Sequence, residues 1–359
     1  MSTAENITIN RLLNAVAERR ATDIHFVVGN YPFIRVKGKL VPLEGEALIT
    51  PEAMQGLINF FIPEERKAEV EAKKELKYIY DWLGKARFRV HIFQQKGFYS
   101  VSLKLIIPQL KSLHELGLPD IVANFLQAKK GIIFIVGPFN SGRSTTLSAM
   151  IQNINQTRSE HILYLEEPIE HLFVNDKSVI EQREVGVDVK TFSEGLRSAK
   201  DEDVNIVAIS RVDEPETLEL LLELAESGRL VIAILDYYSA VTALDGMVSK
   251  FADAKVPWAR NVLADFLVGI IVQRLIPTIA GELILAVEIL TASPSVKALI
   301  KEGRYIGLES IIQTSRAEGM VSLERSLVDL VKQGKISAEE AASNAVDSKA
   351  MAALIKAKS

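Results

Sequence analysis

The chain has 359 residues, 48% of them apolar, which is long for a single core and predicts two or three domains. Its 42 Lys and Arg residues stand against 46 Asp and Glu residues, so it lacks the overall basic field that nucleic-acid binding uses. It contains no cysteine, which excludes a disulfide framework and a thiolate zinc site, and its first residues lack the pattern of a signal peptide.

Residues 1–106 are predicted to form a small α+β domain. Apolar spacing indicates a helix first, then two strands joined by a turn, two helices and three consecutive antiparallel strands. The predicted segments are 7–18, 23–29, 33–40, 51–61, 64–74, 76–82, 86–94 and 98–106.

Two arginines, Arg87 and Arg89, share one face of the strand ARFRV, because side chains alternate along a strand with period two. This pattern has two readings. The strand is either a solvated edge strand, or it presents a basic face for an anion or for an acidic neighbour.

Residues 107–118 contain Pro108, carry little periodicity and are predicted to be a linker. The next domain, 119–290, opens with a helix over 120–127 and then the apolar run Ile132 to Val136, which is typical of a strand buried on both faces.

The run ends at a glycine-bracketed loop, GPFNSGRS, that matches the P-loop pattern G-x-x-x-x-G-K-[ST] except at Arg143. The helix predicted over 144–155 would add its amino-terminal N–H groups to the loop amides, which attracts phosphate. Arg143 keeps a positive charge in a broader, planar form, and Ser144 remains available as a ligand for Mg²⁺. The alternative is a glycine turn that binds nothing. The predicted nucleotide-binding residues of the loop are Gly137, Asn140, Ser141, Gly142, Arg143, Ser144 and Thr145.

Strands and helices then alternate, with apolar runs at 161–166, 205–210, 229–236 and 282–290. This alternation predicts a parallel sheet covered by helices on both faces, with the phosphate site at the carboxyl ends of its strands. The longest apolar stretch, Val262 to Ile276, is interrupted by polar residues and is predicted to be a buried helix and not a membrane span.

After residue 290 the pattern is helical. Helices are predicted over 293–301, 308–318, 322–333 and 337–356, which makes 291–359 a helical carboxyl-terminal region.

Six segments, in order, carry a family resemblance: ATDIHF, ARFRVHIF, GPFNSGRSTTLSAMI, EEPIE, REVG with the following TFSEGLRSA, and SPSVKALIKEG. Together they resemble the secretion ATPase superfamily, and within it the PilT-like retraction ATPases of type IV pili. The resemblance implies a PAS-like amino-terminal domain, a RecA-like P-loop core, and a helical carboxyl-terminal region. It also implies a hexameric ring in the cytoplasm, peripheral to the inner membrane at the base of a pilus machine.

Several functional positions of that family are altered. The lysine of its Walker A motif falls on Arg143, and the glutamate of its Walker B motif falls on Arg211. The positions of two family histidines hold Arg229 and Asp236.

Other functional positions keep the charge of the family residue. The acidic motif keeps two carboxylates, Glu166 and Glu167, which are the candidate catalytic residues. Arg87 and Arg89 match arginines that resemble those reaching a neighbouring subunit's nucleotide.

The altered positions predict a degenerate relative that does not hydrolyse ATP and acts as ring subunit or regulator of a pilus or motility machine. One alternative is a slow ATPase motor in which Arg143 replaces lysine and Glu166 or Glu167 is the base. Another is a sensor that binds nucleotide without turnover. ATP and Mg²⁺ are the expected cofactors if nucleotide binds. The expected partners are copies of the chain, an active ATPase relative and pilus platform proteins, and no nucleic acid or membrane insertion is expected.

Two local hypotheses follow from the altered charges. Arg211 and Asp213 exchange the signs of two family residues, which predicts a retained ion pair between them. Arg143 would plug the loop from within if it paired with Glu167 or Asp236.

Overall fold

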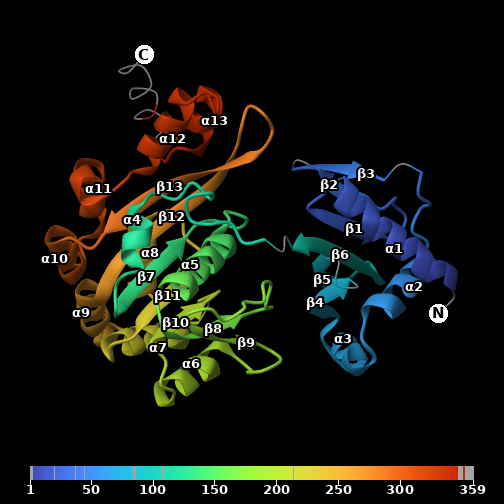
Figure 1. Cartoon of the computed structure of the whole chain (residues 1–359), viewed down its shortest axis with the longest axis horizontal. Helices are drawn as coiled ribbons and strands as arrows, with labels where there is room; N and C mark the ends of the chain where they lie inside the picture. Colours follow the sequence, from blue (N-terminus) through green and yellow to red (C-terminus); the bar gives the residue numbers. More distant parts are fainter. Residues whose placement is uncertain are drawn as a thin grey trace. The chain divides into compact units, whose positions relative to one another are not determined.

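The computed structural model describes residues 3–19, 21–36, 38–43, 45–82, 84, 86–106, 109–212, 214–346 and 351. Its contacts define two units, shown in Figure 1. The amino-terminal unit comprises Met1–Gln109 and Pro168–His171, and the carboxyl-terminal unit comprises Leu110–Glu167 and Leu172–Ser359. No helix in the described ranges is long and apolar enough to cross a membrane.

A six-stranded antiparallel sheet in the order β3-β2-β1-β6-β5-β4 forms the amino-terminal unit. Its strands are β1 (Asp23–Val27), β2 (Phe33–Val36), β3 (Lys39–Pro42), β4 (Glu75–Trp82), β5 (Ala86–Gln95) and β6 (Phe98–Ile106). The helices of this unit are α1 (Thr3–Glu18), α2 (Pro51–Phe61) and α3 (Lys67–Lys73), with a 3₁₀ turn at Glu64–Arg66.

Helix α2 shows how the sequence sets these elements. Thr50 accepts a hydrogen bond from the Ala53 N–H at 3.1 Å. Pro51 occupies the first turn, where a backbone N–H would have no partner within the helix, so the missing N–H of proline costs nothing. The apolar residues of the helix recur at i, i+3, i+4 and i+7 and are buried. They are Met54, Leu57, Ile58 and Phe61.

The single strand predicted over 33–40 is wrong, since the structure has a hairpin of β2 and β3 there. Gly38, at φ +79°, supplies the left-handed turn residue between them. Four residues of the segments predicted up to residue 118 lie outside the described residues. They are Lys37 in the predicted strand 33–40, Lys85 in a predicted turn, and Ile107 and Pro108 in the predicted linker. That this unit is PAS-like stays a prediction.

A seven-stranded sheet in the order β13-β12-β7-β11-β10-β8-β9 is the centre of the carboxyl-terminal unit. Neighbouring strands are parallel, except that β13 runs antiparallel to β12. The strands are β7 (Gly131–Val136), β8 (His161–Glu166), β9 (Val179–Glu184), β10 (Ile206–Ile209), β11 (Leu230–Leu235), β12 (Leu267–Pro277) and β13 (Leu283–Thr291).

Both faces of this sheet are covered, as predicted. Alternate residues of β7 enter different clusters: Ile132 and Phe134 pack with α7, whereas Ile133 packs with α5. The helices up to β13 are α4 (Ile121–Phe125), α5 (Arg143–Thr157), α6 (Phe192–Asp201), α7 (Pro215–Glu226), α8 (Ala240–Val248) and α9 (Val256–Phe266).

The buried helix predicted over Val262 to Ile276 is wrong in its second half. Helix α9 ends at Phe266 and β12 begins at the next residue, between β7 and β13. An apolar run that is buried on both faces fits a central strand as well as a buried helix, so periodicity alone does not separate them. The strand predicted over 282–290 is present as β13, but its antiparallel direction was not predicted, and neither was the edge strand β9.

The region after β13 is helical, as predicted. It contains α10 (Pro294–Glu302), α11 (Leu308–Thr314), α12 (Leu323–Lys332) and α13 (Ala338–Asn344). The helix predicted over 337–356 ends at Asn344, and its residues beyond 346, apart from Met351, lie outside the described ranges.

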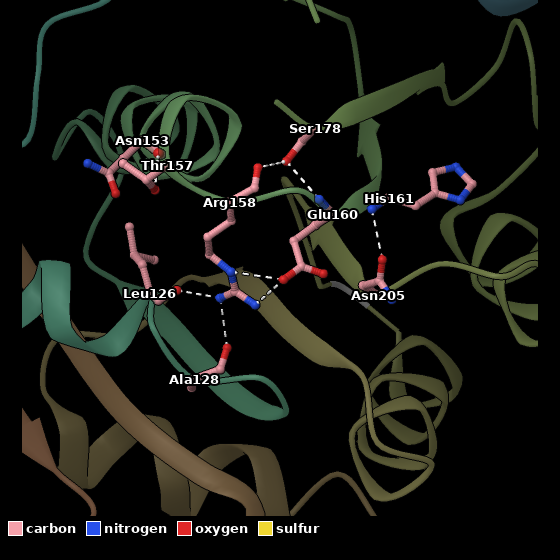
Figure 2. A network of polar contacts seen from close by, with 9 residues as sticks. All are labelled: Leu126, Ala128, Asn153, Thr157, Arg158, Glu160, His161, Ser178 and Asn205. Carbon is pink, nitrogen blue, oxygen red and sulfur yellow. Dashed lines mark hydrogen bonds and ion pairs between the residues drawn. The ribbon is translucent and has the colours of Figure 1, made fainter. Parts of the chain in front are cut away.

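A polar network ties the amino ends of the strands together (Figure 2). Arg158 donates to the carbonyls of Leu126 and Ala128 at 2.5 and 2.8 Å and to Glu160 at 2.6 and 3.0 Å. Ser178 donates to the Arg158 carbonyl at 2.7 Å, which fixes the start of β9 beside β8. This edge is opposite the carboxyl ends, where the predicted site residues lie.

Candidate functional site

The loop Gly137–Gly142 connects β7 to α5 and has a backbone that requires its glycines. A Cβ on Gly137 would lie 2.5 Å from the Gln273 carbonyl oxygen and would also clash with the Ser141 hydroxyl. Gly142 precedes α5 at φ +86°, in the left-handed region, and Asn140 has φ +63°. Strand, loop and helix therefore follow the order that the P-loop pattern predicts.

Gln273, which the sequence analysis did not select, supports this loop. It lies on β12, is fully buried, and donates from Nε2 to the Ser141 carbonyl at 2.8 Å. Gln273 Oε1 and the buried Ser141 Oγ have no hydrogen-bond partner among the described residues. The polar residues that break the apolar run before Ile276 were its only signal in the sequence.

Arg143 begins α5 and is held by the end of β11. Its Nη1 donates to the Leu235 carbonyl at 2.7 Å, and the same nitrogen forms an ion pair with Asp236. The Arg143 side chain is 12% exposed, whereas that of Asp236 is 63% exposed. Of the two partners that the sequence offered for Arg143, the structure selects Asp236. Ser144 and Thr145 are exposed beside it in the first turn of α5.

The two candidate catalytic carboxylates both have partners. Glu166 ends β8, is buried, and accepts from Gln182 Nε2 at 3.3 Å. Glu167 follows it and accepts from Arg211 Nη2 at 2.6 Å. The Arg211 guanidinium also lies 5.6 Å from the centre of the Phe192 ring.

Asp213, the predicted partner of Arg211, lies outside the described residues, so that ion pair stays a prediction. The described partner, Glu167, comes from a different strand end and was not predicted for Arg211.

Arg87 and Arg89 belong to the amino-terminal unit and contact the short segment Pro168–His171 of the same unit. Arg87 Nη1 donates to the Glu170 carbonyl at 2.7 Å, and Arg89 Nη1 donates to Glu170 Oε1 at 2.9 Å. Since β5 pairs with both β4 and β6, the reading of a solvated edge strand is wrong. The described partner is an acidic neighbour.

One edge of the large sheet gathers three altered positions, Arg143, Arg211 and Asp236, together with the retained Glu166. The loop follows β7, Asp236 follows β11, Arg211 lies just after β10 and Glu166 ends β8. Since these strands are parallel neighbours, their carboxyl ends meet at that edge, where α/β proteins bind ligands. Arg229 lies just before β11, at the opposite, amino-terminal edge of the sheet. It donates to the Lys200 and Glu202 carbonyls at 3.2 Å.

The residues of this edge fit a nucleotide in part. Loop amides, the start of α5 and the exposed Ser144 suit phosphate and Mg²⁺. Two features oppose phosphate binding: Arg143 is already paired, and the nearby carboxylate of Asp236 repels a phosphate. Within the described ranges no three His, Asp or Glu residues gather to hold a metal ion.

Residues 98–352 match the family model described as "Type II/IV secretion system protein". The chain is 34% identical to the type IV pilus retraction ATPase PilT of Pseudomonas aeruginosa, over 93% of this chain and 96% of that protein. It is 32% identical to a twitching motility protein of Neisseria gonorrhoeae, over 89% of this chain and 86% of that protein.

A crystal structure of the pilus retraction motor PilT with bound ADP superposes with a TM-score of 0.85 at 34% identity. The match covers 94% of this chain and 97% of that one, and it confirms the predicted α/β fold of the secretion ATPases. The chain therefore belongs to the Type II/IV secretion system protein family, among its PilT-like type IV pilus retraction ATPases.

Proposed function

We propose that this chain is a subunit or regulator of a pilus or motility machine that does not hydrolyse ATP at a rate useful for a motor. The observation that carries the proposal is the hydrogen bond of Arg211 to Glu167 at 2.6 Å. It places a guanidinium at the position that resembles the Walker B glutamate, and it engages the neighbouring carboxylate.

The chemistry of water activation supports the proposal. A positioned general base contributes roughly 10²- to 10⁴-fold to a rate. An arginine cannot accept a proton, so Arg211 cannot serve as that base. Glu167 is neutralised by Arg211, and Glu166 is buried against Gln182.

The wider assignment follows the family. By analogy with PilT, we propose a homo-oligomeric ring with six copies, located in the cytoplasm and peripheral to the inner membrane. Its further partners would be an active ATPase relative, in mixed rings, and the platform proteins of the pilus.

A second candidate, a nucleotide sensor without turnover, is favoured by the conformation of the loop. Gly137 and Gly142 keep the backbone that a phosphate-binding loop needs, and the related PilT structure holds ADP. Here Gly137, Asn140, Ser141, Gly142 and Arg143 would surround the phosphates. Ser144 would contact Mg²⁺, Thr145 would complete the first turn of α5, and Arg87 and Arg89 would act toward a neighbouring subunit.

Phosphate release from the purified full chain with Mg-ATP tests the proposal. We expect no release above a no-protein control, while nucleotide binding is measured separately. Release at the rate of an active PilT measured in parallel would overturn the proposal.

Slow release would need one further comparison. If Glu167→Gln or Glu166→Gln abolishes it and Glu181→Gln, an exposed change on β9, does not, the chain is a slow ATPase and the non-hydrolysing assignment fails. The ring is tested independently by native mass spectrometry of the full chain. A monomer at micromolar concentration, with and without Mg-ATP, would contradict it.

A further inference from the structure

The partner of Arg143 has the chemistry of the ligand that the loop would otherwise hold. We propose that the Asp236 carboxylate is an internal ligand of Arg143 that competes with the phosphates of a nucleoside triphosphate, so that Asp236 sets the affinity of the site. This inference rests on the proposed function, because it assumes that the loop can still receive nucleotide.

The position of Asp236 is set by the sheet and not by a free loop. Leu235 is in register with Val136, so the ends of β11 and β7 lie side by side. The Leu235 carbonyl accepts from the Gly137 N–H at 3.3 Å and from Arg143 Nη1 at 2.7 Å. One carbonyl therefore joins the first residue of the loop to the first residue of α5, and Asp236 follows it directly.

The ion pair with Asp236 already compensates the charge of Arg143. Its Nη1 serves both the Leu235 carbonyl and the Asp236 carboxylate, and the side chain of Arg143 is only 12% exposed. A planar guanidinium binds phosphate and carboxylate with the same donor geometry, so the two acceptors compete for it. A phosphate that takes the Nη1 donors of Arg143 must therefore displace Asp236.

Breaking the ion pair adds a second cost to nucleotide binding, because the Asp236 carboxylate then faces a bound polyphosphate of the same charge sign. Two like charges a few ångströms apart repel each other weakly in water and several times more strongly near a protein surface. Asp236 is 63% exposed, so the weaker repulsion applies. Because loss of the Asp236 charge removes both the competition for Arg143 and this repulsion, we expect it to tighten binding by about tenfold.

The rest of the loop needs no rearrangement in this proposal. Gly142 already has φ +86°, its carbonyl accepts from the Thr146 N–H at 3.1 Å, and α5 continues for 15 residues. Ser144 and Thr145 are exposed. The obstacle is confined to one ion pair, so one substitution should remove it.

The experiment is a competition titration of the full chain with a fluorescent ATP analogue, Mg²⁺ and unlabelled ATP. Asp236→Asn removes the charge while keeping the shape of the side chain, and Asp236→Ser is a second version. Asp253→Asn is the matched control, because it removes an exposed carboxylate from the 3₁₀ turn Asp253–Lys255 elsewhere in the same unit. We expect Asp236→Asn to bind ATP about tenfold more tightly than the unmodified chain, and Asp253→Asn to change binding less than twofold.

A second pair of proteins separates competition for Arg143 from plain repulsion. In an Arg143→Met background, Asp236→Asn should give a clearly smaller gain, because the repulsion is still removed but there is no guanidinium to release. The proposal is overturned if Asp236→Asn gives the same gain with and without Arg143. It is also overturned if neither substitution of Asp236 tightens binding, or if Asp253→Asn tightens it equally.

Phosphate release measured in the same samples keeps the two proposals apart. No release with unchanged affinity in Asp236→Asn would refute the internal ligand and leave the non-hydrolysing assignment intact. Rapid release by the unmodified chain would refute that assignment whatever the affinities are.

Discussion

Gln273 on β12 donates a hydrogen bond to the carbonyl of Ser141, 132 residues earlier in the chain, at 2.8 Å. Both residues are buried, so this contact holds the phosphate loop against a strand from inside the molecule. The strand β12 is therefore part of the site, although it contributes no residue of the P-loop pattern.

Replacing Gln273 with leucine should loosen the loop. The change leaves the buried Ser141 carbonyl without its donor, which costs about 1–3 kcal/mol of unfolding free energy. Urea unfolding measures this cost, and hydrogen exchange of peptides covering 131–157 locates it. Gln313→Leu, at an exposed position of α11, is the control and should stay within about 0.5 kcal/mol. Unchanged exchange in Gln273→Leu would show that the contact does not hold the loop.

A methyl group at Gly137 should be tolerated poorly. It would collide with the Gln273 carbonyl, a backbone atom that cannot move aside, and with the Ser141 side chain. We expect Gly137→Ala to lower the unfolding free energy by about 3 kcal/mol. Gly281→Ala, in the open β12–β13 turn at φ +80°, should cost only about 1 kcal/mol from its backbone conformation. Equal melting temperatures for the two variants would contradict the close approach of β12 to the loop.

The polar network of Arg158, at the amino ends of the strands, should affect stability but not nucleotide binding. Arg158 is 11% exposed and compensates Glu160 while satisfying two carbonyls (Figure 2). Arg158→Met removes all these bonds and leaves Glu160 without its cation, which should cost about 3 kcal/mol of unfolding free energy. Arg325→Met, which removes a half-buried i,i+4 pair with Asp329 on α12, should cost under about 1 kcal/mol. Nucleotide affinity should be unchanged in both proteins, and a selective loss in Arg158→Met would assign this edge to the site.

The sequence was sufficient for the strand, loop and helix around Gly137, because buried β-branched residues, paired glycines and helical spacing agree there. It was insufficient for β12, because a run buried on both sides has no period that separates strand from helix. It also missed β9, whose residues from Glu181 to Glu184 are polar and lie at the sheet edge.

The pairs of the site depend on the order of strands in the sheet. Local sequence identified Arg143, Arg211, Glu167 and Asp236 as altered or retained positions, but it offered two partners for Arg143 and did not predict Glu167 as a partner of Arg211. These residues meet because β7, β11, β10 and β8 are neighbours, and that order is a property of tertiary packing.

The buried carboxyl group of Glu288 should make stability depend on pH. Glu288 is 9% exposed on β13 and accepts from the Ala240 N–H, at the start of α8, at 2.8 Å. Burial raises its pKa to about 7 from the ordinary 4.5; the Ala240 N–H lowers it, Glu324 and Glu309 raise it and Arg274 lowers it.

The folded chain therefore keeps this proton to a higher pH than the unfolded chain does. The stabilisation is complete below pH 4.5 and is lost as the pH rises through about 7. Glu288→Gln keeps the acceptor oxygen and removes the titration. Relative to the unmodified chain, its unfolding free energy should increase by up to about 3 kcal/mol between pH 5 and pH 8. Glu282→Gln, at an exposed position before β13, is the control and should show no such trend. If urea unfolding gives the same difference for Glu288→Gln at both pH values, Glu288 is ionised throughout and its burial does not hold the proton.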